Sequence, residues 1–162
     1  MKSFDIIIIG AGLSGLSLTL EILKRTNKKI LILEKKKKLV KDKNFCFWNF
    51  PQNYFTNQSD TTWRSIKIKE KNKTLIKTDE DFYYCHLSSK TFYRNCMNLI
   101  RSNKNAKILF DQKIYSTISN DTKVLVNSNN NIFKTELLFD SRPKKIVKNK
   151  LLQHFYGVEV TS

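Results

Sequence analysis

The stretch that decides the fold lies near the start of the chain and reads Phe4-Asp5-Ile6-Ile7-Ile8-Ile9-Gly10-Ala11-Gly12-Leu13-Ser14-Gly15. The run of isoleucine at positions 6–9 suits a central parallel strand that is covered on both faces. Directly after it, glycines at positions 10, 12 and 15 follow the spacing G-x-G-x-x-G. In this motif the first glycine makes a tight turn, the second admits a pyrophosphate close to the backbone, and the third lets helix and strand pack closely. The motif therefore predicts a strand, a turn and a helix that bind a dinucleotide.

The residues after the motif complete a βαβ unit. Apolar side chains recur at helical spacing from Leu13 to Leu23 and predict a helix that ends near Arg25. Residues 30–33 predict a second strand, and Glu34 follows it about twenty residues after the motif, where a carboxylate accepts hydrogen bonds from the adenosine ribose. We therefore expect residues 1–38 to bind the ADP half of a dinucleotide. The predicted cofactor-binding residues are Gly10, Ala11, Gly12, Leu13, Ser14, Gly15, Glu34 and Lys35.

The spacing does not separate FAD from NAD, because both cofactors carry an ADP moiety. The motif lies near the start of the chain and is followed by a long interruption before a meander of strands. This order resembles the first halves of the glutathione-reductase-like flavoproteins, and the resemblance implies a Rossmann-like fold that binds FAD. Glu34 disfavours a 2′-phosphate because two like charges would meet there, although the lysines at 35–38 could offset this repulsion. The alternative for the motif is a glycine-rich turn without a ligand.

The remaining chain predicts further strands and one more helix. Residues 39–60 are aromatic and irregular and are interpreted as a long ordered loop. A hairpin is expected from 63–69 and 73–77, with Trp63, Ser65, Lys67 and Lys69 on one face. Ser88 or Ser89 can cap a helix that runs to about Arg101. The later expected strands are 106–110, 114–119, 123–127 and 132–139, of which the last three form a small meander.

These elements predict an α/β fold in one incomplete FAD/NAD(P)-binding domain over residues 1–162. Residues 61–87 and 150–162 are assigned to the sheet of an α+β substrate domain, and residues 88–140 return to the dinucleotide-binding domain.

Composition narrows the functional classes. The chain has 30 Lys and Arg against 14 Asp and Glu, a net charge of +16, which can mark nucleic acid, an anionic membrane surface or acidic ligands. Basic residues are spread over ordinary elements, so we expect no nucleic acid, and a nucleotide-composition bias of the genome is the favoured explanation of the lysine content. Three widely spaced cysteines and two histidines predict neither disulfides nor a metal site. No apolar run predicts a membrane span or a signal peptide, so a cytoplasmic protein is expected.

Three segments of the chain resemble the bacterial lycopene cyclase family. The first is Lys43-Asn44-Phe45-Cys46-Phe47-Trp48, and the second is Phe82-Tyr83-Tyr84 with the following residues 88–96. The third combines Asp140-Ser141-Arg142-Pro143 with Leu151-Leu152-Gln153-His154-Phe155-Tyr156-Gly157-Val158-Glu159, and it is the most specific of the three. The resemblance spans nearly all of the chain.

This resemblance implies a flavoprotein that closes the rings at the ends of lycopene without net redox change. It implies reduced FAD, with NAD(P)H as a possible source of electrons, and peripheral contact with an anionic membrane that holds the carotenoid. The acid that protonates the substrate is expected beyond Ser162, so no catalytic residue is assigned within the chain, which looks like an N-terminal fragment with the missing half possibly on a second chain. The ring type, β or ε, stays open.

Two alternatives to the cyclase reading also stay open. One is an FAD-dependent oxidoreductase or hydroxylase, or a flavoprotein similar to geranylgeranyl reductases. The other is a non-catalytic dinucleotide-binding remnant or one half of a split enzyme.

Overall fold

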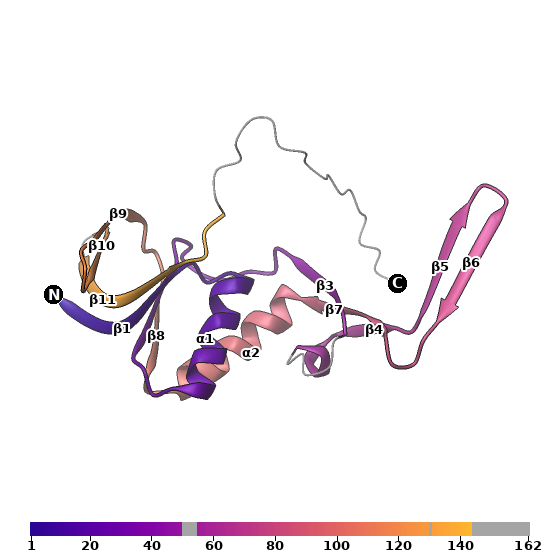
Figure 1. The fold of residues 1–162 in the computed structure, drawn as a ribbon, viewed down its shortest axis with the longest axis horizontal. Helices are drawn as coiled ribbons and strands as arrows, with labels where there is room; N and C mark the ends of the chain where they lie inside the picture. The colour runs from indigo at the N-terminus through magenta and orange to yellow at the C-terminus, as the bar shows by residue number, and fades with distance from the viewer. Residues whose placement is uncertain (50–54, 130, 144–162) are drawn as a thin grey trace.

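A six-stranded sheet with the strand order β8-β2-β1-β11-β10-β9 lies on the left side of the molecule in Figure 1. The structure is a computed structural model that describes residues 1–49, 55–129 and 131–143. The strands of this sheet are β1 (Lys2–Ile9), β2 (Ile30–Leu33), β8 (Ala106–Leu109), β9 (Ile114–Ser119), β10 (Val124–Ser128) and β11 (Asn131–Asp140). Strands β8, β2, β1 and β11 are parallel, whereas β10 and β9 continue the sheet in antiparallel pairing. The predicted α/β fold, its βαβ unit and its meander are confirmed.

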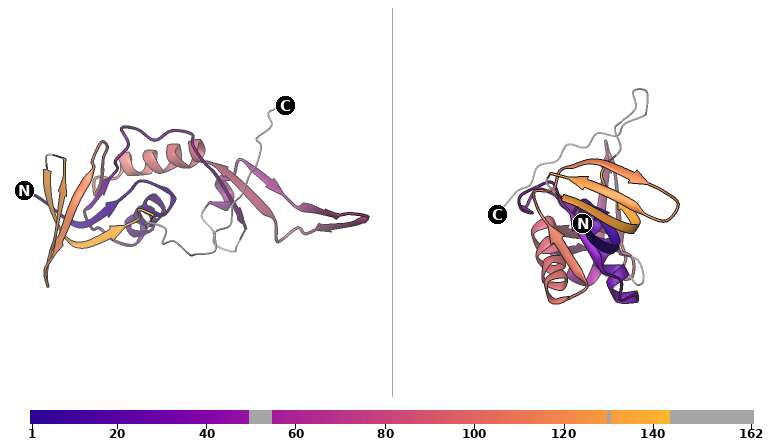
Figure 2. Two further views of the ribbon diagram at one scale, coloured as in Figure 1. Left: turned by 90° about the horizontal axis from the view of Figure 1, so that it is seen from above. Right: turned by 90° about the vertical axis from the view of Figure 1, so that its left-hand side faces the viewer.

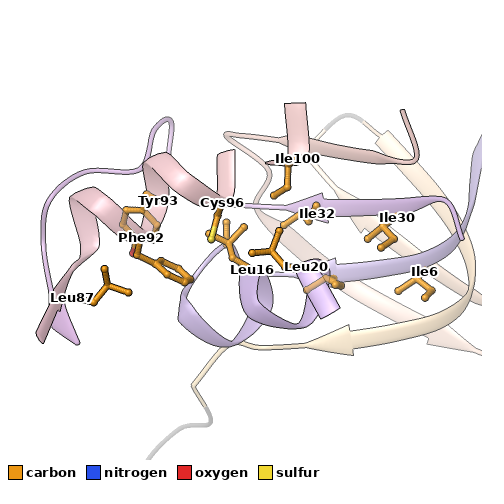
Figure 3. Close-up of a cluster of buried hydrophobic side chains, with 12 residues drawn as sticks. Ile6, Leu16, Leu20, Ile30, Ile32, Leu87, Phe92, Tyr93, Cys96 and Ile100 are labelled. Carbon is orange, nitrogen blue, oxygen red and sulfur yellow. The ribbon is translucent and has the colours of Figure 1, made fainter. Parts of the chain in front are cut away.

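Both faces of β1 are buried, which explains its continuous apolar sequence. On one face, α1 (Leu13–Arg25) and α2 (Ser89–Ser102) cover the sheet, and Ile6 and Ile8 pack into a cluster with side chains from both helices (Figure 3). On the other face, Ile7 and Ile9 pack with Val126 and Phe133 from the meander. Because β1 lies between β2 and β11, its carboxyl end lies in the interior of the sheet edge, where the glycine motif follows.

The second helix begins where the sequence predicts. The side chain of Ser88 accepts a hydrogen bond from the backbone amide of Thr91 at 3.3 Å, so Ser88 is the N-cap of α2. Phe92 is fully buried, and its ring lies 5.4 Å from that of Phe45 and 5.3 Å from that of Phe55. These contacts join α2 to segments that precede it by more than thirty residues, and they fix the helix against the sheet.

A second, three-stranded sheet corrects the sequence-based expectation for residues 39–60. This stretch contains β3 (Asn44–Trp48) and the short 3-10 helix η1 (Thr56–Gln58), so the prediction of a long loop throughout was wrong. Strand β3 pairs with β7 (Tyr84–Ser88), which in turn pairs with β4 (Thr61–Trp63). The partner of β3 lies about forty residues away in sequence, and therefore no local turn signal announces the pairing.

The predicted hairpin is confirmed as β5 (Ser65–Glu70) and β6 (Lys73–Thr78), joined by a turn at Lys71, which has a φ of 46°. The placement of Trp63 in this hairpin was wrong, because Trp63 belongs to β4 and pairs with Tyr84 in the second sheet. Figures 1 and 2 show the hairpin extending away from the two sheets.

Other expectations lie partly or wholly outside the described residues. They are the assignment of 150–162 to a substrate-domain sheet and the family-like segment at 151–159. The assignment of 61–87 to a substrate domain stays a prediction. No helix in the described ranges is both long and apolar enough to cross a membrane.

Candidate dinucleotide-binding site

In the turn that follows β1, only glycine fits at the first and last glycine positions of the motif, Gly10 and Gly15. Gly10 has a φ of 98°, a left-handed conformation that strains any other residue. Its amide donates to the carbonyl oxygen of Leu33 at 2.8 Å, which ties the turn to the end of β2. A Cβ on Gly15 would lie 2.1 Å from the carbonyl oxygen of Gly10, so Gly15 is required for the close approach of α1 to the turn.

Ser141 is a residue of this site that sequence reasoning did not place there. Its hydroxyl donates to the carbonyl oxygens of Ile9 at 2.8 Å and Gly10 at 3.2 Å. Its amide also donates to the carbonyl oxygen of Ile9, at 2.9 Å. Ser141 thus holds the start of the glycine turn from the neighbouring strand β11. A usable signal is its position directly after a strand that is parallel to β1, since such strand ends meet at one sheet edge.

Gly12, by contrast, faces open space. A Cβ at this position would meet no described atom within 4 Å, and the φ of −82° is one that any residue adopts. Gly12 is the N-cap of α1, and no side chain caps this helix end. The first backbone bond of the helix runs from the amide of Leu16 to the carbonyl oxygen of Gly12 at 3.0 Å.

These hydrogen bonds show which backbone amides remain available to bind an anion. Those of Gly10 and Ala11 are engaged, by the Leu33 carbonyl oxygen and the Glu34 carboxylate respectively. In the part of the chain that the structure describes, the amides of residues 12–15 have no acceptor. Four free donors at the positive end of α1 beside an unfilled space form an anion site that needs no basic side chain.

Glu34 lies where the sequence predicts, at the carboxyl end of β2, and is only 7% exposed. Its Oε2 accepts a hydrogen bond from the amide of Ala11 at 2.7 Å, and its Oε1 accepts one from the amide of Lys36 at 2.8 Å. The carboxylate therefore fixes the glycine turn to the segment after β2. Each oxygen keeps a further lone pair that can accept a hydroxyl donor. Lys35, the other predicted residue here, is exposed.

The double role of Glu34 gives a first prediction. In Glu34→Gln, one of the two backbone amides bound by the carboxylate loses its acceptor, and we expect the free energy of unfolding to fall by about 1 to 3 kcal/mol. Urea denaturation measures this change. The matched control is Glu21→Gln, since the side chain of Glu21 is 45% exposed and pairs with Lys24, and its loss should cost under about 0.5 kcal/mol. Equal effects in the two variants would contradict the structural role of Glu34.

A second hollow lies among aromatic residues at the three-stranded sheet. It has a volume of about 470 Å³, and its lining residues are Trp48, Trp63, Ser65, Ile66, Lys67 and Tyr84. The ring of Trp48 stacks on Phe82 with 4.8 Å between centroids and lies 4.9 Å from the ring of Tyr84. The pairing of β3 with β7 thus brings together two of the aromatic segments that carry the family resemblance.

The buried cysteine of α2 is not a reactive group. Burial raises the pKa of the Cys96 thiol to about 12, so this cysteine stays protonated and unreactive at neutral pH. Within the described ranges, no group of three or more histidine, cysteine, aspartate or glutamate side chains could hold a metal ion.

The parallel sheet, the two helices on one face and the glycine turn define a Rossmann-like α/β domain of the FAD/NAD(P)-binding type. The chain belongs to the lycopene cyclase family, because the family model described as "Lycopene cyclase protein" matches residues 5–162. None of the curated proteins matches the sequence significantly.

Solved structures share this fold. The p-nitrophenol 4-monooxygenase PnpA from Pseudomonas putida DLL-E4 superposes with a TM-score of 0.72 at 13% identity, over 86% of this chain and 41% of that one. CtdE in complex with FAD gives a TM-score of 0.63 at 15% identity, over 86% and 38% of the two chains. The halogenase PltM, in complex with phloroglucinol and FAD, gives 0.62 at 16% identity, over 86% and 34%. This chain therefore spans about two fifths or less of the length of these structures, and at such identities the likeness concerns the fold.

Proposed function

We propose that this chain forms the ADP-binding part of an FAD-dependent lycopene cyclase. One observation carries the proposal: the amides of residues 12–15 have no acceptor among the described residues and a Cβ on Gly12 would lie in open space, while Glu34 lies at the end of the next strand. A diphosphate fits the amides and the ribose hydroxyls fit the remaining lone pairs of the carboxylate, as the dinucleotide fold requires. The family and the FAD complexes of CtdE and PltM support FAD as the dinucleotide.

Different residues of the chain would bind different parts of the cofactor. Gly12, Leu13, Ser14 and Gly15 would donate to the pyrophosphate, and Glu34 would accept from the ribose. Gly10, Ala11 and Ser141 shape the turn, since their polar backbone groups are engaged within the protein. Lys35 would meet the outer part of the adenosine from the surface. Reduced FAD, when bound, supplies electron density that can stabilise positive charge on a substrate.

The aromatic hollow is the proposed contact for one end of lycopene. A polyene is apolar, and its protonated end is a carbocation that is stabilised by the electron-rich faces of aromatic rings. Trp48, Trp63 and Tyr84 present such faces around a space of about 470 Å³. Protonation of a terminal double bond and later loss of a proton leave the oxidation state unchanged, so the reaction is an isomerisation. We assign no described residue as the acid.

A second candidate function is an FAD-dependent oxidoreductase or hydroxylase, which the fold shared with the monooxygenase PnpA favours. The two candidates differ in their products. A cyclase converts lycopene to a cyclic isomer of equal mass without net consumption of NAD(P)H, whereas a hydroxylase consumes one NAD(P)H for each oxygen inserted. Chromatography and mass spectrometry of carotenoids, with the chain expressed together with any continuation of its reading frame, separate the two outcomes.

A binding measurement tests the carotenoid contact directly. We expect Trp48→Ala to weaken lycopene binding about tenfold, because it removes one wall of the hollow and a stacking partner of Phe82. Quenching of the remaining tryptophan fluorescence by lycopene in detergent micelles measures the affinity. Tyr115→Ala is the matched control, since Tyr115 is 64% exposed on β9, outside the hollow. Equal affinities of the two variants would argue against this contact.

A further inference from the structure

A groove rimmed by positive charge lies between α2 and the segment that follows β2. It has a volume of about 340 Å³ and lies apart from the aromatic hollow. From α2 it receives Lys90, Arg94 and Arg101, whose spacings of four and seven residues place them on one side of the helix. Lys38 and Lys41 stand across from them. Five cationic side chains therefore surround one hollow.

Two acidic residues of the segments beside this groove, Asp42 and Glu34, are engaged with groups outside its lining. Asp42 pairs with Lys36 at 2.5 Å, and the carboxylate of Glu34 is buried against two backbone amides. Asp111 is exposed and is not a lining residue. In the described part of the chain, no carboxylate forms an ion pair with the lining residues Lys38, Lys90, Arg94 and Arg101.

The positive charges on α2 repel one another when no anion is bound. Lys90 and Arg94 are like charges at i and i+4 on one helix, a pair that is destabilising. An anion in the groove would offset this repulsion. The floor also contains apolar surface from Leu39, Met97 and Phe110, and it includes Tyr93, which is only 7% exposed. A ligand that fits both features carries several negative charges next to an apolar part.

We propose that this groove binds the phosphate end of an organic anion. The guanidinium groups of Arg94 and Arg101 provide forked donors that match phosphate oxygens, and the lysines add point charges. The groove is separate from the dinucleotide site, because its lining includes neither the glycine turn at 10–15 nor Glu34. The same chemistry is offered by a soluble phosphorylated metabolite and by the headgroup of an anionic phospholipid.

Two probes distinguish these sources, and both are measured in a Gly12→Val background so that the α1 site does not contribute. Inorganic pyrophosphate is titrated by calorimetry, and flotation compares vesicles of phosphatidylglycerol with vesicles of phosphatidylcholine. The test variant is Lys90→Gln with Arg94→Gln. The control is Lys28→Gln with Lys29→Gln, which removes the same charge from exposed residues outside the groove. Thermal denaturation should find the test variant at least as stable as its parent, since both replaced side chains are exposed and their mutual repulsion is removed.

We expect the test variant to weaken one of the two probes about tenfold and the control to leave it within about twofold. Loss of pyrophosphate binding identifies a soluble phosphate, and loss of phosphatidylglycerol binding identifies a lipid headgroup. The proposal is overturned if neither probe binds, or if test and control weaken binding equally, because net charge would then explain the result.

Discussion

Gly12→Val is expected to abolish binding of FAD and ADP while leaving the fold intact. The φ of −82° at this position suits valine, and a Cβ there meets no described atom within 4 Å. The two methyl groups would instead occupy the space in which a diphosphate approaches the free amides of α1. We expect the affinity for ADP to fall at least a hundredfold, which corresponds to about 2.7 kcal/mol or more. Calorimetric titration with ADP and with FAD measures the loss.

Two further measurements make this prediction specific. Gly12→Ala, with one methyl group, should give an intermediate loss of affinity, since it fills less of the same space. Ser17→Ala, one turn further along α1, should bind ADP as the parent protein does. An unchanged affinity in Gly12→Val would refute the dinucleotide site, whereas a collapsed fold would refute the open geometry at Gly12.

Gly15→Ala is expected to have the opposite result, a loss of fold stability. Its Cβ would lie 2.1 Å from the carbonyl oxygen of Gly10 and 2.9 Å from the hydroxyl of Ser141. The first of these atoms is backbone, so α1 must move away from the turn. Alanine favours helix by up to about 1 kcal/mol over glycine. We nevertheless expect a net loss of about 3 kcal/mol, because overpacking at a backbone contact outweighs this gain.

Urea denaturation followed by circular dichroism measures this loss. Ser17→Ala is again the control, since it also introduces alanine on α1 but adds no atom, and it should alter stability by under about 0.5 kcal/mol. A Gly15→Ala variant as stable as the control would show that helix and turn are not in the close contact described. Substitution of Gly12 is thus expected to affect ligand binding, whereas substitution of Gly15 is expected to affect folding.

The sequence was informative where signals are local. The isoleucine run, the glycine spacing and the leucine period determine β1, the turn and α1 within twenty-five residues, and the helix ends at Arg25 as predicted. The meander is likewise a series of neighbouring strands with polar turns between them. Glu34 was placed correctly because its distance from the motif follows from the length of one helix and one strand.

Long-range pairing could not be inferred in the same way. The strand β3 was missed because its partner β7 lies about forty residues away, with a 3-10 helix and a hairpin between them. Trp63 was assigned to the wrong sheet because alternation continues through Arg64, although the chain changes partner there. The basic groove could not be predicted for a related reason. Its lysines and arginines come from segments about fifty residues apart, and in the sequence each looks like an ordinary surface charge.

The pairing of β1 with β11 has a consequence for the order of folding. Ser141 meets Ile9 across 132 positions of sequence, and β11 supplies one of the two flanks of β1. During synthesis, a nascent chain that stops short of β11 exposes the isoleucines of β1 along an unpaired edge, which is a template for aggregation. The contact order of this pair is high, so closure of the sheet is a late and slow event. Formation of the proposed cofactor site therefore has to wait for β11, even though the residues that would hold the cofactor leave the ribosome first.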